Sequence, residues 1–176
     1  MTDQHAELCE KLGAFEPGIL PREVFHAIAR LVVVPTFVVI PLLRRGDRVF
    51  VSLQEREASD PHYASMLHPA GTVIRPTDPS LPATYARLMA AELPEVRVRN
   101  GPTFVYTAHD TIARGREISL VHWVELADDG VLPDLFDADA LPTTVVKTDY
   151  PRIARAVAHF RASSVGSSTV PTTPWY

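Results

Sequence analysis

The segment over residues 66–94 constrains the fold of this chain more than any other, because it joins an apolar strand, a tight turn, a loop and a helix. Residues 69–71, Pro-Ala-Gly, form a turn signal directly after the apolar stretch. Asp78 or Ser80 suits the N-cap of a helix, and a proline follows in the first turn. We therefore expect a helix over residues 81–93. Its predicted buried side chains are Ala86, Met89, Ala90 and Leu93.

Two pairs of strand-like segments flank this unit. In the first pair, residues 36–44 and 48–54 are separated by Arg-Gly-Asp at 45–47, which predicts a hairpin turn. In the second pair, residues 103–108 and 118–126 enclose a long polar tip. The pairs predict antiparallel strands on both sides of the helix.

Helical patterns lie at both ends of the chain. Residues 3–12 place Leu8, Cys9 and Leu12 on one face, a short helix begins at Pro21, and a last helix begins near Pro151. The predicted inward positions are Val24, Phe25, Ile28 and Ala29 in the second helix and Ile153, Ala156, Val157 and Phe160 in the last. This order of elements predicts an α/β (α+β) fold with a mixed sheet and an N-terminal helical extension.

Bulk composition excludes several classes of protein. The 176 residues suit one domain, and a net charge of -4 gives no basic field for nucleic acid or an anionic membrane. The single cysteine, Cys9, excludes an internal disulfide and is expected to be a semi-buried thiol. The longest apolar run, residues 31–43, contains two prolines and is too short to cross a bilayer. With no secretory signal in the first residues, we expect a cytoplasmic protein.

From about residue 32 to 160 the chain resembles a Nudix hydrolase domain. The features that carry the resemblance are a strand ending in Arg56, the turn at Pro69 and Gly71, the helix with Arg87, and Leu141-Pro142 before the closing helix. The resemblance implies an α/β/α sandwich. It divides the chain into an N-terminal helical extension (1–30), a Nudix-like domain (31–162) and a Ser/Thr/Pro-rich tail (163–176), whose Trp175-Tyr176 end is either disordered or a docking element.

The signature box of that family is only partly present. The family has a glycine, five residues, a glutamate, seven residues, and then Arg-Glu-aliphatic-x-Glu-Glu-x-Gly-aliphatic. Gly71 and Arg87 match but are 16 apart instead of 14, so the loop is two residues longer. Of the four box glutamates, only Glu92 is kept. The positions that differ are occupied by Thr77, Leu88, Ala91 and Pro94.

The lost acids have a chemical consequence. Helix positions 88, 91 and 92 share one face, where three carboxylates would hold Mg²⁺ against a diphosphate. With Glu92 alone, the resemblance implies impaired hydrolysis and a weak site for Mg²⁺ or Mn²⁺, with Glu95 or Asp78 as candidate additional ligands. If this face meets a ligand cleft, Leu88 is expected to be only partly buried.

Other candidate site residues surround the box. The catalytic candidates are Glu92 and His68, a neutral imidazole at the mouth of the expected cleft that is otherwise a polar residue at a strand end. The ligand-binding candidates are Arg56, Gly71, Arg87, His109 and Arg116. Arg87 is also expected to steady the loop before the helix, and the tip with His109 and Arg116 contacts phosphate or is merely solvated. His122, alternating with apolar strand neighbours, is expected to be structural.

Three functions are compatible with these residues. The first is a Nudix-fold protein that binds a nucleoside-diphosphate-type ligand, with impaired metal-dependent hydrolysis. The second is an atypical active Nudix hydrolase built around Glu92. The third is a non-catalytic module that contacts a protein partner or a second copy of the chain through its N-terminal helices or tail.

Overall fold

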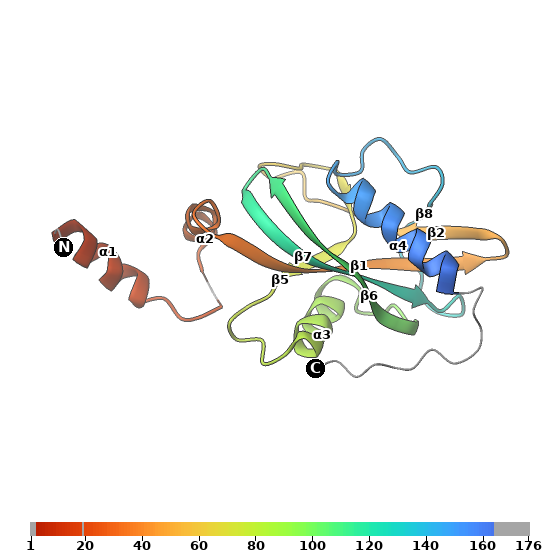
Figure 1. The fold of residues 1–176 in the computed structure, drawn as a ribbon, viewed down its shortest axis with the longest axis horizontal. Helices are drawn as coiled ribbons and strands as arrows, with labels where there is room; N and C mark the ends of the chain where they lie inside the picture. Colours follow the sequence, from red (N-terminus) through yellow and green to blue (C-terminus); the bar gives the residue numbers. More distant parts are fainter. Residues whose placement is uncertain (1–2, 19, 164–176) are drawn as a thin grey trace.

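A six-stranded mixed sheet forms the centre of the computed structural model, which describes residues 3–18 and 20–163 (Figure 1). Its strands are β1 (Val33–Arg45), β2 (Arg48–Ser52), β5 (Ala70–Val73), β6 (Val98–Ile112), β7 (Gly115–Leu126) and β8 (Leu135–Asp137). Two short strands, β3 (Gln54–Glu55) and β4 (Leu67–His68), form a separate ribbon. The helices are α1 (Asp3–Gly13), α2 (Arg22–Ala29), α3 (Leu81–Glu92) and α4 (Asp149–Ser163). The predicted order of elements is confirmed, with short strands added.

Strand β1 lies at the centre of the sheet and is buried on both faces. It runs parallel to β7 and antiparallel to β2 and β5, which makes the sheet mixed. Because side chains alternate along a strand, Val38 and Ile40 enter one core cluster while Phe37 and Val39 enter the other. The continuous apolar run of β1 is typical of a strand covered on both sides.

The two core clusters correspond to two helical layers. Helix α4 covers one face of the sheet, and α3 covers the other (Figure 1). The four apolar side chains predicted to face inward from the last helix are all buried. The predicted α/β/α sandwich is therefore confirmed.

Helix α3 buries a different face from the one predicted. Its N-cap is Ser80, whose hydroxyl accepts a hydrogen bond from the Ala83 N–H. Thr84 and Leu88 are buried, whereas Ala86 and Ala90 are exposed. Met89 is partly buried and Leu93 is buried, so two of the four predicted contacts are wrong. The helix is apolar on several sides, and its sequence pattern did not identify the face that meets the sheet.

Both predicted hairpins are present, but the second is longer than expected. Gly46 and Asp47 connect β1 to β2, with Gly46 at a φ of 58° that glycine adopts without strain. Strands β6 and β7 pair as far as Ile112 and Gly115, so the expected polar tip is mostly strand. Polar side chains persist there because one side of that part of the sheet faces solvent.

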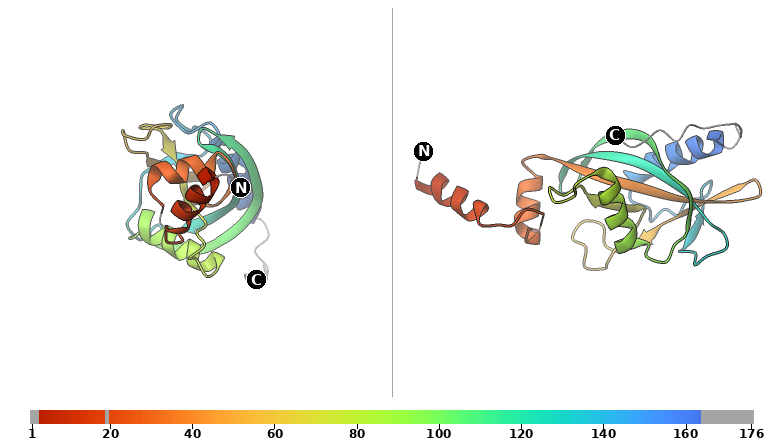
Figure 2. Two further views of the ribbon diagram at one scale, coloured as in Figure 1. Left: turned by 90° about the vertical axis from the view of Figure 1, so that its left-hand side faces the viewer. Right: turned by 90° about the horizontal axis from the view of Figure 1, so that it is seen from below.

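The region over residues 1–30 consists of two different parts. Helix α1 projects away from the body of the protein (Figure 2), and none of its residues is buried. Cys9 is exposed, so the expected semi-buried thiol is wrong. Helix α2 begins after Pro21, its N-cap, and lies against the body, with Ala29 buried beside Gly115. Trp175 and Tyr176 lie outside the described residues. Within the described part of the chain, no helix is long and apolar enough to cross a membrane.

Candidate functional site

A cavity of about 570 Å³ lies where several chain segments converge. Its walls come from α2, the start of β1, the β3–β4 ribbon with its connecting loop, the β4–β5 turn, the end of α3, the β6–β7 hairpin and the start of α4. Cavities of this size accommodate small ligands. Four of the candidate residues line it together: Arg56, His68, Gly71 and Glu92.

Arg56 has a central position among the charges of the cavity. Its Nε and Nη2 atoms donate to one carboxylate oxygen of Asp60, at 2.8 and 2.6 Å, and its guanidinium lies 5.8 Å from the ring centre of Tyr63. Its charge also acts on His68 and Glu92, in addition to the effects of burial on those groups. Within residues 3–18 and 20–163, Nη1 of Arg56 has no hydrogen-bond partner, so one edge of the guanidinium is available to an anion.

Glu92 joins the end of α3 to the Pro-Ala-Gly turn. One of its carboxylate oxygens accepts a hydrogen bond from the Gly71 N–H at 3.1 Å, and its backbone carbonyl accepts one from the Gln54 side chain. Burial raises the pKa of Glu92 to about 6, against the opposing effects of the Gly71 N–H and Arg56. This acid thus has a structural role in the turn and also faces the cavity.

The residues around Glu92 do not fit a Mg²⁺ site of the family pattern. Leu88 is 1% exposed and belongs to the core beneath α3, so the expectation that it is partly buried in a cleft is wrong. Ala91 is exposed and offers no oxygen ligand. Among the described residues, no three His, Cys, Asp or Glu side chains are grouped so that they could hold a metal ion. Because Mg²⁺ prefers several oxygen ligands, the single carboxylate of Glu92 is a poor site for this ion.

Arg87 and Asp78 anchor the loop that precedes α3. Arg87 donates to both carboxylate oxygens of Asp78, to the Thr72 hydroxyl and to the Val73 carbonyl. Hydrogen bonds from Arg87 hold the pKa of Asp78 well below its usual range. Arg87 therefore steadies the loop as the resemblance implied, and neither residue lines the cavity.

Three imidazoles line the cavity. Burial, aided by the charge of Arg56, lowers the pKa of His68 to about 4, so this side chain is neutral at pH 7. His26 of α2 faces His62 of the β3–β4 loop, with 5.8 Å between ring centres. Helix α2 thus supplies one wall of the cavity, including the exposed Arg22 at its first turn.

The wall of the cavity that α4 contributes to contains an ionic cluster centred on a buried arginine. Arg152 of α4 pairs with Asp110, Glu117 and Asp149 at 2.6, 2.6 and 3.0 Å, and it also donates to the Ser119 hydroxyl. Arg152 is 5% exposed, and Glu117 and Asp149 are buried to a similar degree. Burial alone would lower the pKa of Arg152, but its three carboxylate partners raise it.

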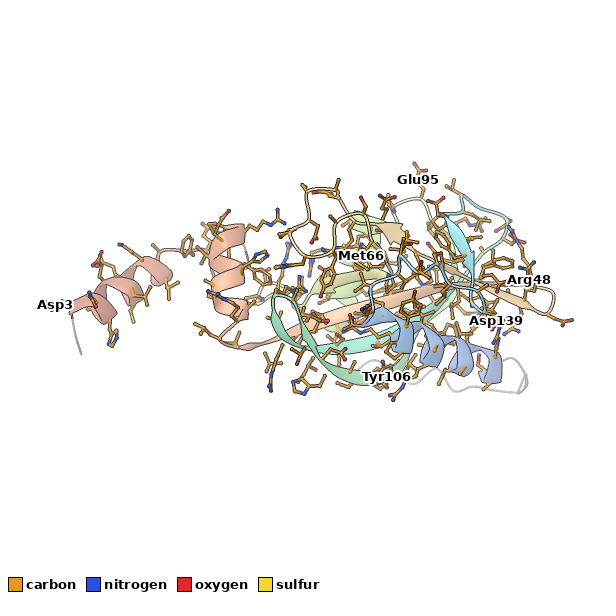
Figure 3. The ribbon with its side chains drawn as sticks, turned by 90° about the horizontal axis from the view of Figure 1, so that it is seen from above. Asp3, Arg48, Met66, Glu95, Tyr106 and Asp139 are labelled. Atoms are coloured by element: carbon orange, nitrogen blue, oxygen red, sulfur yellow. The ribbon has the colours of Figure 1, made fainter. Side chains whose placement is uncertain are left out.

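The remaining candidates lie away from this cavity. His109 is exposed on β6, and Arg116 lines a shallower groove beside the start of β1. Glu95 follows α3 and points outward from the surface (Figure 3). His122 is buried and stacks on Phe37 with 4.3 Å between ring centres, in agreement with its expected structural role.

The sequence did contain a signal for the ionic cluster. Asp149 precedes Ile153 by four residues and Arg152 precedes Ala156 by four, so both charges extend the apolar stripe of α4. In β7, Glu117 has the same two-residue alternation as the buried Val121. Charged side chains on inward-facing positions indicate mutual pairing. No comparable pattern marks the loop residues of the cavity.

Comparisons with known proteins agree with this architecture. No protein-family model matches the sequence, and no curated protein is significantly similar to it. The NUDIX domain of Shewanella oneidensis NrtR, solved with ADP ribose, has a TM-score of 0.54 at 16% identity, covering 91% of this chain and 99% of that domain. The Ap4A hydrolase of C. elegans has a TM-score of 0.55 at 12% identity, covering 74% of this chain and 99% of that enzyme.

The longer NrtR chain from Shewanella oneidensis, solved alone and with a 27mer DNA, gives a TM-score of 0.53 in both cases, at 15% and 14% identity. These matches cover 74% and 73% of this chain, which spans only 65% and 63% of the longer NrtR chains. At identities this low, the structural matches establish only the arrangement of helices and strands. Function has to be argued from the residues of the site. The chain has the Nudix fold.

Proposed function

We propose that this protein binds a nucleoside-diphosphate-type ligand in the cavity beside Gly71 and Glu92, and that its metal-dependent hydrolysis is impaired. The observation that carries the proposal is the position of Arg56, whose guanidinium has an unpartnered edge among the described residues in a cavity of ligand size. A guanidinium with a free edge is suited to phosphate oxygens. Arg22 and Arg114 line the same cavity, while Tyr63 and the imidazoles offer surfaces for a base or sugar.

The ligands of similar folds support this class. The NrtR domain was solved with ADP ribose, and the C. elegans enzyme is an Ap4A hydrolase; both compounds carry adenosine on a chain of phosphates. The 27mer DNA belongs to NrtR, of whose chain this protein spans 63%. Because the net charge here is -4, we propose no nucleic-acid partner.

The impaired metal-dependent hydrolysis is proposed because too few acidic side chains lie beside the turn. One carboxylate beside the turn, already bonded to Gly71, is a poor site for a divalent cation. We expect the free protein to bind Mg²⁺ or Mn²⁺ no better than about millimolar. Ligand binding is then expected to persist in a chelator.

Calorimetry with ADP ribose and ADP, in EDTA and in Mg²⁺, tests the proposal. Arg56→Gln is expected to weaken binding roughly 10- to 100-fold, as for loss of a charged hydrogen bond. The matched control is Arg116→Ala, which removes an arginine that lies outside the cavity and is expected to bind as wild type does. If Arg56→Gln disturbs the loop held by Asp60, Arg56→Lys keeps the charge and is expected to recover part of the affinity.

Two results would contradict the proposal. Undetectable binding of every nucleoside diphosphate tested would remove the ligand class. Fast Mg²⁺- or Mn²⁺-dependent hydrolysis that Glu92→Gln abolishes would instead establish the atypical active hydrolase.

A further inference from the structure

Asp149 offers a hydrogen-bond acceptor to the cavity that no described residue satisfies. Its side chain is 8% exposed and lines the cavity, and its Oδ1 accepts from Nη1 of Arg152 at 3.0 Å. Oδ2 has no hydrogen-bond partner among the described residues, and it is not fully buried. Oδ2 is therefore the oxygen of this cavity residue that is left for a further donor.

The surrounding cluster fixes this acceptor in place. Arg152 cannot turn toward Oδ2 without losing Asp110, Glu117 and Ser119, which hold its other nitrogen atoms. Asp149 is also the first residue of α4, so its backbone is held by the helix. A rigid acceptor loses little entropy when it binds a donor.

The charges of the cavity differ in what they leave free. Asp149 and Glu117 are both held by Arg152 on the α4 side, whereas Arg56, whose charge acts on Asp149 as well as on Glu92, keeps Nη1 without a partner among the described residues. A phosphate beside Oδ2 would be repelled, because two negative charges at hydrogen-bond distance repel strongly where water is scarce. The phosphates are thus directed to Arg56, and the uncharged part of the ligand to Asp149.

We infer that Asp149 is a specificity-determining residue that accepts a hydrogen bond from the nucleoside half of the ligand, either from an amino group of the base or from a ribose hydroxyl. This inference rests on the proposed function. It goes further by orienting the ligand: the diphosphate lies at Arg56, and an N–H or O–H donor lies at Oδ2 of Asp149.

Asp149→Asn tests the inference, because asparagine can still accept from Arg152 while it presents an NH₂ group to the cavity. We expect this variant to bind ADP at least tenfold more weakly and to bind inorganic diphosphate as well as or better than wild type, since a repelling charge is gone. Asp110→Asn is the matched control. It removes another carboxylate partner of Arg152 from a residue that does not line the cavity, and it is expected to bind ADP as wild type does.

Two analogues identify the donor. If the penalty of Asp149→Asn disappears with 2′-deoxy-ADP, the donor is the ribose hydroxyl; if it disappears with the diphosphate of purine riboside, which lacks the amino group, the donor is on the base. Should Asp149→Asn fail to fold, Asp149→Ala removes Oδ2 while leaving Arg152 paired with Asp110 and Glu117, and it carries the same expectation for ADP.

The inference is overturned if Asp149→Asn binds ADP as tightly as wild type does. It is also overturned if the variant loses ADP and inorganic diphosphate equally, or if Asp110→Asn causes the same loss, since these results indicate general damage. Failure of wild type to bind any nucleoside diphosphate overturns the proposed function as well, which separates the two failures.

Discussion

The two walls of the cavity differ in how they use acidic side chains. The α3 wall, where the family box would place several glutamates, has Glu92 alone, and this acid bonds to the backbone of Gly71. The α4 wall has the carboxylates of Glu117 and Asp149, and both pair with Arg152, which also pairs with Asp110 outside the cavity. One wall has too few acids for a metal site, and on the other the acids are already ion-paired with Arg152. The number of carboxylates in a cavity therefore does not measure its capacity for metal.

The two walls also differ in the interactions that stabilise them. At the α3 wall, Leu88 fills the core and links the helix to the sheet. At the α4 wall, Arg152 takes the corresponding buried place, with hydrogen bonds in place of apolar contacts. Changes on the two walls should therefore destabilise the protein for different reasons.

The largest effect is expected at Leu88. Leu88→Glu, which would restore a box glutamate, should lower the free energy of unfolding by at least about 5 kcal/mol, because lost core packing of roughly 2–5 kcal/mol adds to the cost of an unpaired buried carboxylate. Urea denaturation monitored by circular dichroism measures it. Ala91→Glu is the control on the exposed side of the helix, with an expected change within about 0.5 kcal/mol.

Leu88→Glu also tests the orientation of α3. A well-folded variant with raised Mn²⁺ affinity would mean that this side chain reaches the cavity, against its 1% exposure here. Ala91→Glu alone is expected to leave the Mn²⁺ affinity unchanged, since position 91 does not line the cavity.

The second-largest loss of stability is expected from a substitution of Arg152. Arg152→Ala should destabilise the protein by about 3–5 kcal/mol, because Asp110, Glu117 and Asp149 then lose their common partner in a buried site. Arg161→Ala is the matched control on the same helix. Arg161 pairs with Asp139 at the surface, and such pairs contribute about 0–1 kcal/mol. Equal denaturation midpoints for the two variants would show that the ion pairs of Arg152 contribute no more to stability than the surface pair of Arg161 does.

Patterns of alternation and helical spacing predicted the layers of the fold. The central strand followed from its continuous apolar run, the first hairpin from its turn residues, and the buried face of α4 from helical spacing. The face of α3 was mispredicted because Ala and Met occur on several sides of this helix, so that only tertiary contact with the sheet selects Leu88.

Apart from Arg56, which the family resemblance suggested, the correctly predicted cavity residues belong to one continuous segment. His68, Gly71 and Glu92 belong to one strand-turn-helix unit, and the structure brings them to one cavity. Contacts between residues on separate segments were not predictable in this way. Periodicity could place Arg152 and Glu117 on inward faces, but it could not pair them, since they lie 35 residues apart.

Helix α2 shows the same limit at the other end of the cavity. His26 of α2 meets His62 of the β3–β4 loop only in the folded protein, with 5.8 Å between ring centres. Neither residue is part of a periodic apolar pattern, so nothing in the sequence links them. The sequence analysis therefore placed no site residue in the N-terminal extension, although its second helix forms part of the wall.

The smallest effect is expected from the titration of Glu92. Burial raises the pKa of Glu92 from 4.5 to about 6, so the folded protein binds this proton more tightly than the unfolded chain does. The stability that results is fully present below pH 4.5 and is lost as pH rises through 6. Glu92→Gln keeps a carbonyl acceptor for Gly71 but does not titrate.

We therefore expect the stability of wild type relative to Glu92→Gln to fall by about 1 kcal/mol between pH 4.5 and pH 7.5, after allowance for partial exposure of the side chain to solvent. Urea denaturation at four or five pH values within this range measures the difference. The difference also cancels the opposite contribution of His68, whose pKa of about 4 makes both proteins gain stability as pH rises from 4 to 6.5. A stability difference that is independent of pH would mean that Glu92 is solvated like a surface acid. Glu92 would then differ from the acids around Arg152 in its burial as well as in its lack of an arginine partner.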